Sequence, residues 1–259
     1  MTFEILNSSL LQEFIKIVGN SPVDILNDLE KNETPVDYFQ FYNSVSSVYS
    51  SKIEGENIDF DSFFKHKFLH VKYQPDYTKK ADHLFLAYEF IFRNKLTLEN
   101  LQKAHSILSS NLLPKSQQGI IRNNPMLVIN SNDRIEYVAT EPGLVIPELN
   151  KLFNDIHTLE KTKLNDFEIF YYAAYIHLVF VKIHPFQDGN GRAARLLEKW
   201  FLIEQIDKKA AAVQLEKNYY KHLGNYYSNI KKLGTEYEGL DYSKSLDFLL
   251  MTAQGLKTQ

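Results

Sequence analysis

The residues of this chain that could do chemistry are concentrated between His184 and Arg195, where the sequence reads HPFQDGNGRAAR. This segment holds an imidazole, a carboxylate, two glycines and two arginines, and apolar residues flank it on both sides. The pattern predicts a helix, a tight loop and a second helix, with the polar side chains gathered at the junction.

The loop has the properties of an anion site. Gly189 and Gly191 on either side of Asn190 allow the backbone to turn and to expose its N–H groups. A helix that begins at about Gly191 adds unpaired N–H groups and the positive end of its dipole, which favours phosphate. Arg192 and Arg195 are three residues apart, so they project from nearly the same helical face and can bind more than one phosphate.

Asp188 and His184 add a metal ligand and a base to this anion site. Asp188 offers one hard oxygen ligand, which suits Mg²⁺ bound to phosphates. His184 titrates near neutral pH and could take a proton from an attacking hydroxyl group. Each feature alone has an ordinary structural explanation: a turn, a solvated face or a structural histidine before proline. Their combination in one loop between two apolar helices favours a functional site.

The same residues match the motif His-x-Phe-x-Asp/Glu-Gly-Asn-Gly-Arg-x-x-Arg in full, and on them the chain resembles the Fic family of nucleotide-dependent transferases. The resemblance implies an all-α, Fic-type helical bundle with a small β-hairpin flap, and transfer of AMP from ATP to a protein hydroxyl group. It implies His184 as the general base, Asp188 as the Mg²⁺ ligand and Phe186 as a buried anchor of the nucleotide-binding loop. The residues it assigns to the phosphates are Gly189, Asn190, Gly191, Arg192 and Arg195.

A second motif lies nearer the start of the chain. Apolar residues recur at helical spacing over 38–53, the dipeptide Thr34-Pro35 predicts the entry to this helix, and Gly55 is a natural cap at its end. Glu54 lies at the negative end of the helix dipole, where a carboxylate is disfavoured by about 0.3–1 kcal/mol. A compensating cation or a solvated glutamate before a glycine cap would each account for it.

The segment Ser50-Ser51-Lys52-Ile53-Glu54-Gly55 resembles the Ser/Thr-x-x-x-Glu-Gly/Asn inhibitory motif of Fic proteins. In such relatives the glutamate pairs with the second arginine of the core motif, here Arg195, and ATP then binds in an unproductive pose. The resemblance therefore implies a chain that inhibits itself through its own N-terminal region, with Ser50, Glu54 and Gly55 as regulatory residues. Part of the family uses the same glutamate to remove AMP from a modified target.

Apolar periodicity predicts the remaining elements. The predicted helices cover residues 3–18, 81–92, 98–108, 149–159, 166–183, 215–233 and 243–256. Residues 126–129 and 135–138 are typical of a β-hairpin. This hairpin is either a structural flap or an edge that accepts an extended peptide. The resemblance favours docking of the target protein on the 119–147 segment, which includes Arg122 and Ile146-Pro147.

Two groups of side chains have a more ordinary interpretation on the residues alone. His105 and His177 lie on apolar helices and are predicted to be hydrogen-bonded core histidines. The aromatic stripe at 219–227 is typical of a core-facing helix. The resemblance implies that Tyr220, within the Tyr219-Tyr220 pair, contacts the adenine, with Asn225 close to the position of a following asparagine.

Composition limits the class of protein. The 259 residues are 44% hydrophobic and 24% charged, which is typical of a globular chain. We divide the chain into an N-terminal helical region (1–75) and a Fic-type core (76–259), which we expect to pack closely together. A net charge of −3 argues against a nucleic-acid partner, and the aromatic, basic run at 60–73 is too short to change this. The apolar stretch 167–183 contains a lysine and a histidine, so we expect a buried helix and no membrane contact. The absence of cysteine and of a secretory signal fits a cytoplasmic location.

These features together predict a protein adenylyltransferase that uses ATP and Mg²⁺ and modifies a target protein or the chain itself. The alternatives are removal of AMP from a modified target, transfer of another nucleotide at the same site, and a non-enzymatic module that binds nucleotide and a partner protein.

Overall fold

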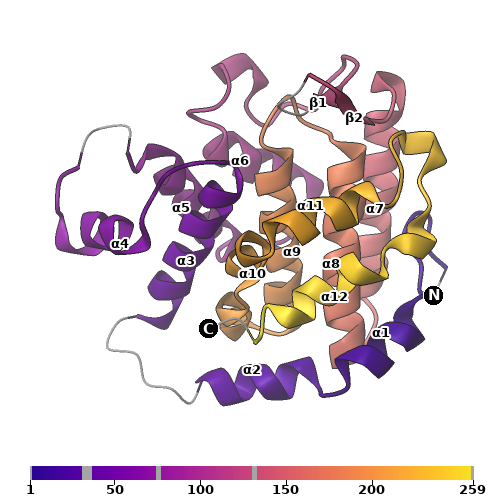
Figure 1. Ribbon diagram of the computed structural model, residues 1–259, viewed down its shortest axis with the longest axis horizontal. Helices are drawn as coiled ribbons and strands as arrows, with labels where there is room; N and C mark the ends of the chain where they lie inside the picture. The colour runs from indigo at the N-terminus through magenta and orange to yellow at the C-terminus, as the bar shows by residue number, and fades with distance from the viewer. Residues whose placement is uncertain (1, 31–36, 74–76, 130–132, 258–259) are drawn as a thin grey trace.

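Two buried helices form the centre of the fold in a computed structural model, which describes residues 2–30, 37–73, 77–129 and 133–257 (Figure 1). Helix α8 (Asp166–Ile183) begins at a capping box, in which Asn165 Oδ1 accepts a hydrogen bond from the Glu168 N–H at 3.0 Å and the Glu168 carboxylate accepts one from the Asn165 N–H at 2.8 Å. Helix α8 is apolar on all sides and is therefore buried. It packs along α9 (Asn190–Gln205), and the short connection between them is the motif loop.

The other helices surround this pair. They are α1 (Leu11–Val18), α2 (Pro22–Glu30), α3 (Tyr38–Ile53), α4 (Phe60–Leu69), α5 (Lys79–Ile91), α6 (Leu98–Leu108), α7 (Val145–Glu160), α10 (Leu215–Lys221), α11 (Leu223–Lys231) and α12 (Leu246–Gln254). Helices α7 and α12 pack on α8, α6 packs on α9, and α3 lies between α5 and α10, while α4 projects at the edge of the molecule (Figure 1).

Strands β1 (Leu127–Ile129) and β2 (Ile135–Val138) form an antiparallel hairpin, the sole sheet in the described part of the chain. Its register shifts between Val128 and Ile129, and the Val138 N–H donates to the Thr235 carbonyl at 2.8 Å, which ties the hairpin to the segment after α11. The all-α prediction with a small hairpin flap is thus confirmed.

Several predicted boundaries are wrong. Residues 3–10 form no helix, because the Asp155 carboxylate accepts hydrogen bonds from three of their N–H groups, each at 2.8 Å. The predicted helix over 215–233 breaks at His222, whose φ of −116° and ψ of 39° separate α10 from α11. Helix α7 already begins at Val145, so Ile146-Pro147 belongs to a helix. The predicted helix entry at Thr34-Pro35 lies outside the described residues.

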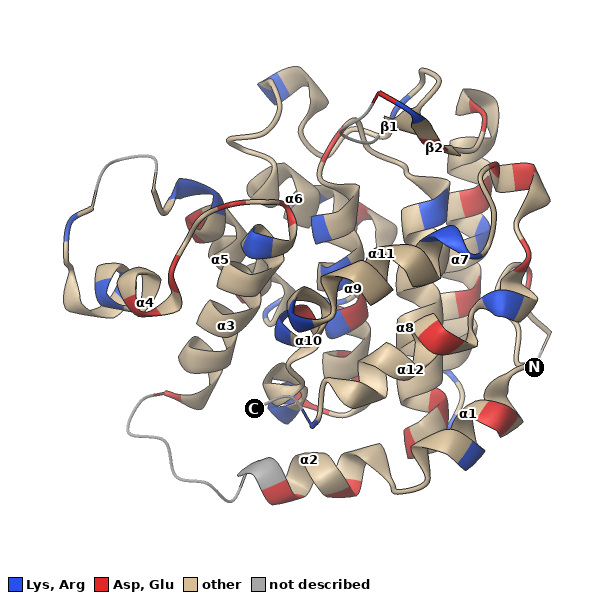
Figure 2. Cartoon of the chain, in the orientation of Figure 1, with Lys and Arg blue, Asp and Glu red and all other residues tan. Residues whose placement is uncertain are grey.

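Charged residues of both signs are distributed over the helices, and no described helix has the features of a membrane span. Figure 2 shows acidic and basic residues interspersed along the helices. In the basic run at 60–73, Phe63 is fully buried against α3 and α5. Among the described helices, none combines the length and the apolar character needed to cross a membrane.

Candidate active site

The Asn190 side chain closes the motif loop through hydrogen bonds to the Phe186 backbone. Helix α8 ends at Ile183 and is capped by His184, which adopts the left-handed conformation with φ 54° and ψ 59°. Phe186 is fully buried, and Asn190 clasps it: Oδ1 accepts from the Phe186 N–H and Nδ2 donates to the Phe186 carbonyl, both at 2.8 Å. The Asn190 side chain therefore fixes the shape of the loop.

The two loop glycines are required for different reasons. Gly189 has φ +77°, and a Cβ atom there would lie 3.2 Å from Leu108 and 3.3 Å from His105 Nε2. A Cβ atom at Gly191 would lie 2.9 Å from Glu54 Oε1 and 3.3 Å from Arg195 Nη1. Gly191 thus lets a side chain from the N-terminal region approach the start of α9.

His184 is held as a neutral base. Its Nδ1 lies 3.2 Å from the Val181 carbonyl, so the network assigns the ring proton to Nδ1 and leaves Nε2 as an acceptor. Burial lowers the pKa of His184 to about 4, and the Arg122 guanidinium adds to this effect. Near pH 7 the imidazole is neutral, which is the form that can take a proton from a hydroxyl group.

The residues of the loop fit a magnesium–triphosphate ligand. Asp188 is exposed, and its Oδ1 accepts from the Gly189 N–H at 2.5 Å. The described residues contain no cluster of three metal-binding side chains, but Mg²⁺ on a nucleotide needs few protein ligands because phosphates and water supply the rest. Arg192 is 5% exposed and its Nε has no hydrogen-bond partner among the described residues, which is unusual for a buried guanidinium and suits an anion.

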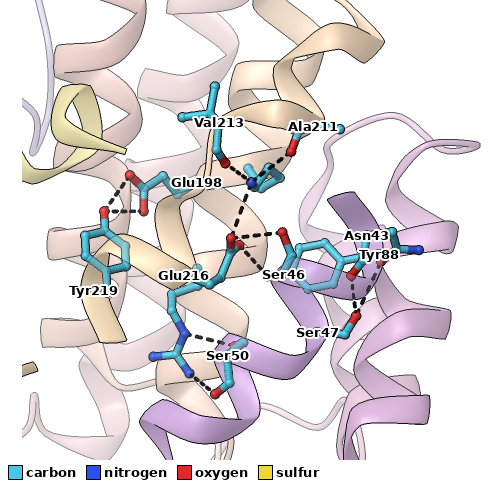
Figure 3. Close-up of polar contacts among 12 residues, drawn as sticks. Asn43, Ser46, Ser47, Ser50, Tyr88, Glu198, Ala211, Val213, Glu216 and Tyr219 are labelled. Carbon is cyan, nitrogen blue, oxygen red and sulfur yellow. Dashed lines mark hydrogen bonds and ion pairs between the residues drawn. The ribbon is translucent and has the colours of Figure 1, made fainter. Parts of the chain in front are cut away.

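Arg195 is fully buried and pairs with Glu54. Glu54 Oε1 lies 2.6 Å from Nη2 of Arg195, across a sequence separation of 141 residues. Burial raises the pKa of Glu54, but Arg195 and Arg192 more than offset this and hold it below its usual value. Ser50 also engages Arg195, through Oγ at 2.9 Å from Nε and through its carbonyl at 3.2 Å from Nη2 (Figure 3). The structure therefore brings the two motifs of the sequence together at one guanidinium group.

Helix α3 is fixed against α9 and α10 by a buried polar seam that sequence reasoning missed. The Glu216 carboxylate accepts from Ser46 Oγ at 2.9 Å and from the Tyr88 hydroxyl at 2.7 Å, and it lies 3.3 Å from Lys199 Nζ (Figure 3). The small buried side chains of α3 allow this approach; they are Ser44, Ser46, Ser47, Ser50 and Ser51. The high serine content of an otherwise helical segment was the available signal.

A cavity of about 250 Å³ lies beside these groups. Its walls include Glu54, His184 and Arg195, together with Tyr137 of the hairpin and Tyr226 of α11. Two larger clefts, of about 730 and 640 Å³, contain none of the motif residues.

Tyr220 does not reach this cavity. Its ring packs 5.7 Å from the ring of Tyr49 and under Lys52 Nζ, at 5.2 Å. Tyr219 is buried behind α9, and Asn225 lines the 640 Å³ cleft. The aromatic residues that do line the cavity from α11 come later in the stripe, at Tyr226 and Tyr227.

The flap and the motif loop are tied to each other. Arg122 Nε donates to the His184 carbonyl at 2.7 Å, and Nη2 donates to the Thr140 carbonyl at 2.8 Å. His105 accepts from the Gly119 N–H at Nδ1, 3.0 Å away, and its Nε2 lies 2.9 Å from the Asp188 carbonyl. His105 and His177 are hydrogen-bonded core residues as predicted, but the role of His105 as the link between flap and loop was not foreseen.

The chain is similar to known proteins in a segment of its sequence and in its fold. The Fic/DOC family model matches residues 95–202, which include the complete motif. No curated protein matches the chain by sequence.

Solved structures match over nearly the whole chain. A Fic family protein from Desulfovibrio desulfuricans G20 has a TM-score of 0.76 at 18% identity, over 99% of this chain and 74% of that protein. A Fic domain-containing signalling protein from Bacteroides thetaiotaomicron VPI-5482 has 0.62 at 16%, over 97% of both chains. Fic-1 from C. elegans has 0.62 at 16%, over 96% of this chain and 70% of that one. The chain therefore has the fold of Fic proteins, and its residues 95–202 match the Fic/DOC family model.

Proposed function

We propose that the chain is a protein adenylyltransferase that moves AMP from ATP to a hydroxyl side chain of a target protein, and that Glu54 restrains it. Proteins with the Fic fold generally transfer a nucleoside monophosphate to other proteins. One observation carries the proposal: a neutral His184, the N-terminus of α9 and two buried arginines converge on the same site beside a cavity.

The chemistry follows from this convergence. The oxygen of the target hydroxyl attacks the α-phosphorus of ATP, and His184 Nε2 takes the proton from that hydroxyl. The bond from the α-phosphorus to its bridging oxygen breaks, and pyrophosphate leaves. The loop N–H groups, Arg192 and Arg195 neutralise charge on the phosphates. Asp188 would hold Mg²⁺, which supplies further charge neutralisation on the phosphate oxygens.

Glu54 restrains this reaction because it occupies Nη2 of Arg195 at 2.6 Å. A triphosphate that needs both arginines must displace the carboxylate or bind in another pose. The Glu54 carboxylate also lies close to the start of α9, where its charge repels phosphate.

The target protein would dock on the hairpin flap. Leu127, Ile129 and Ile135 are exposed by 44%, 55% and 58%, and strand β1 is an edge that an extended peptide can join. This places a bound segment beside the cavity, where one of its hydroxyl groups can reach His184.

The test is transfer of α-labelled ATP with Mg²⁺ to proteins of a cell lysate and to the chain itself. We expect the Glu54→Gly variant to label protein faster than the unsubstituted chain, and the double variant with His184→Ala to label none. GTP, CTP and UTP, labelled in the same way, establish the nucleotide preference. An absence of labelling by Glu54→Gly with every nucleotide would overturn the proposal.

A second activity, removal of AMP from a modified target, is favoured by the position of Glu54. Its ionised carboxylate lines the same cavity as His184 and could orient a water molecule for attack. Release of AMP from a modified target by the unsubstituted chain, and no release by Glu54→Gly, would assign this activity.

A further inference from the structure

Besides Glu54 and Ser50 of the N-terminal region, Arg195 has a further hydrogen-bond partner on α11. Its side chain is 1% exposed, whereas that of Glu54 is 26% exposed and lies at the end of α3. A buried guanidinium needs lasting compensation by hydrogen bonds or charge. Nη1 of Arg195 donates to the hydroxyl of Tyr226 on α11 at 3.3 Å.

A series of buried hydrogen bonds connects Tyr226 to the carboxylate of Glu198. The Tyr226 hydroxyl lies 3.0 Å from His177 Nε2, and His177 Nδ1 lies 2.6 Å from Glu198 Oε2. A carboxylate only accepts, so Nδ1 carries the ring proton and Nε2 accepts from Tyr226. The Tyr226 oxygen can then accept from Arg195. Tyr226 is 1% exposed, and His177 and Glu198 are fully buried.

Glu198 is itself held rigidly. The Tyr219 hydroxyl donates to its two oxygens at 2.8 and 2.9 Å (Figure 3), and Thr252 Oγ1 donates to Oε1 at 2.6 Å. Glu198 lies one turn after Arg195 on α9. Hydrogen bonds through His177 and Tyr226 connect its carboxylate to the Arg195 guanidinium. None of these hydrogen bonds involves a residue of the N-terminal region.

We propose that Glu198, His177 and Tyr226 are positioning residues for Arg195. They hold the guanidinium towards the phosphates when Glu54 withdraws, so the active site stays preorganised without its inhibitor. The proposal rests on the proposed function only in taking a nucleoside triphosphate as the ligand. It predicts that these three residues control the affinity for the distal phosphates of ATP and leave the affinity for AMP unchanged.

The test measures binding of ATP and of AMP, with Mg²⁺, by calorimetry in the Glu54→Gly background. Loss of one hydrogen bond to a charged group corresponds to about a tenfold loss of affinity, so we expect Tyr226→Phe to bind ATP about tenfold more weakly and AMP as the parent does. Tyr219→Phe is the matched control, because it removes the same atom from a neighbouring buried ring, while Thr252 and His177 still hold Glu198 and the hydrogen bonds from Glu198 to Arg195 remain. We expect it to bind ATP as the parent does.

His177 provides an independent variant, because it does not line the cavity and cannot lose a contact with the nucleotide. We expect His177→Phe to weaken ATP binding selectively and His177→Gln, whose amide can still accept from Tyr226, to restore most of it. Equal ATP affinity in Tyr226→Phe and Tyr219→Phe, or an equal loss for AMP, would overturn the positioning role. Protein labelling by the Glu54→Gly parent is measured separately. If that parent labels no protein while Tyr226→Phe selectively loses ATP affinity, adenylyl transfer is overturned and the positioning role stands.

Discussion

Neutralising Glu54 tests whether its carboxylate and a triphosphate compete for Arg195. Glu54→Gln keeps the size of the side chain and removes its charge. The pair is short, at 2.6 Å, and Arg195 is almost fully buried, so water screens the interaction weakly. A hydrogen bond between charged groups contributes about 1.5–3 kcal/mol, and ATP must break this one to reach Nη2. We therefore expect Glu54→Gln to bind ATP about 10- to 100-fold more tightly.

Calorimetry with ATP and AMP at constant Mg²⁺ and salt measures this difference. Glu56→Gln is the control, because Glu56 lies two residues later, is 30% exposed and pairs with Lys80 instead of Arg195. It removes the same charge from the same loop. Equal ATP affinity in the two variants, or an equal gain for AMP, would refute the competition.

The same pair gives a pH dependence of stability. The pKa of Glu54 is lower in the folded chain than its unfolded value of about 4.3, so the unfolded chain binds the proton more readily. The stabilisation is present above that value and is lost as pH falls through the folded pKa. Without nucleotide, we expect Glu54→Gln to lower the free energy of unfolding by about 1–2 kcal/mol at pH 7, with the difference vanishing in acid. A difference that persists unchanged at pH 3 would contradict this account.

Two further predictions concern buried charges. Burial lowers the pKa of Lys182 to about 8, below its unfolded value of about 10.4, so the charged form destabilises the fold at neutral pH. We expect Lys182→Met to raise the free energy of unfolding by roughly 1–3 kcal/mol at pH 7, with the gain shrinking as pH rises towards 10. Asp155→Ala leaves the N–H groups of Glu4, Ile5 and Leu6 without their acceptor; we expect a loss of about 2–4 kcal/mol and faster proteolysis of the N-terminal segment.

Urea unfolding at several pH values checks both predictions. Lys103→Met, at a lysine that is 55% exposed, is the control for Lys182 and should show no pH-dependent gain. A gain for Lys182→Met that is the same at pH 7 and pH 10 would show that packing, and not charge, is its cause. Stability and proteolysis of Asp155→Ala equal to those of the unsubstituted chain would show that the N-terminal segment is held by its apolar contacts alone.

Local patterns in the sequence predicted the elements whose stability is local. The helix over 38–53, the central helix after Asn165 and the hairpin at 126–138 follow from periodicity, capping and strand propensity between near neighbours. The predictions were wrong where a residue far away in the sequence determines the backbone conformation. Asp155 keeps residues 3–10 out of a helix from some 150 residues away, and no periodicity reports such a partner.

The motif loop is the part of the site that the sequence determined by itself, because twelve consecutive residues contain the turn, the helix start and the polar groups. The sequence left open whether Glu54 is solvated or paired with a cation, and only the resemblance named Arg195 as its partner. Tertiary packing decided the rest: the serine face of α3 brings Glu54 to α9, and the elements around α9 join Arg195 to Glu198 through His177 and Tyr226. Such contacts depend on how helices far apart in the chain are oriented against one another, which residue spacing does not encode.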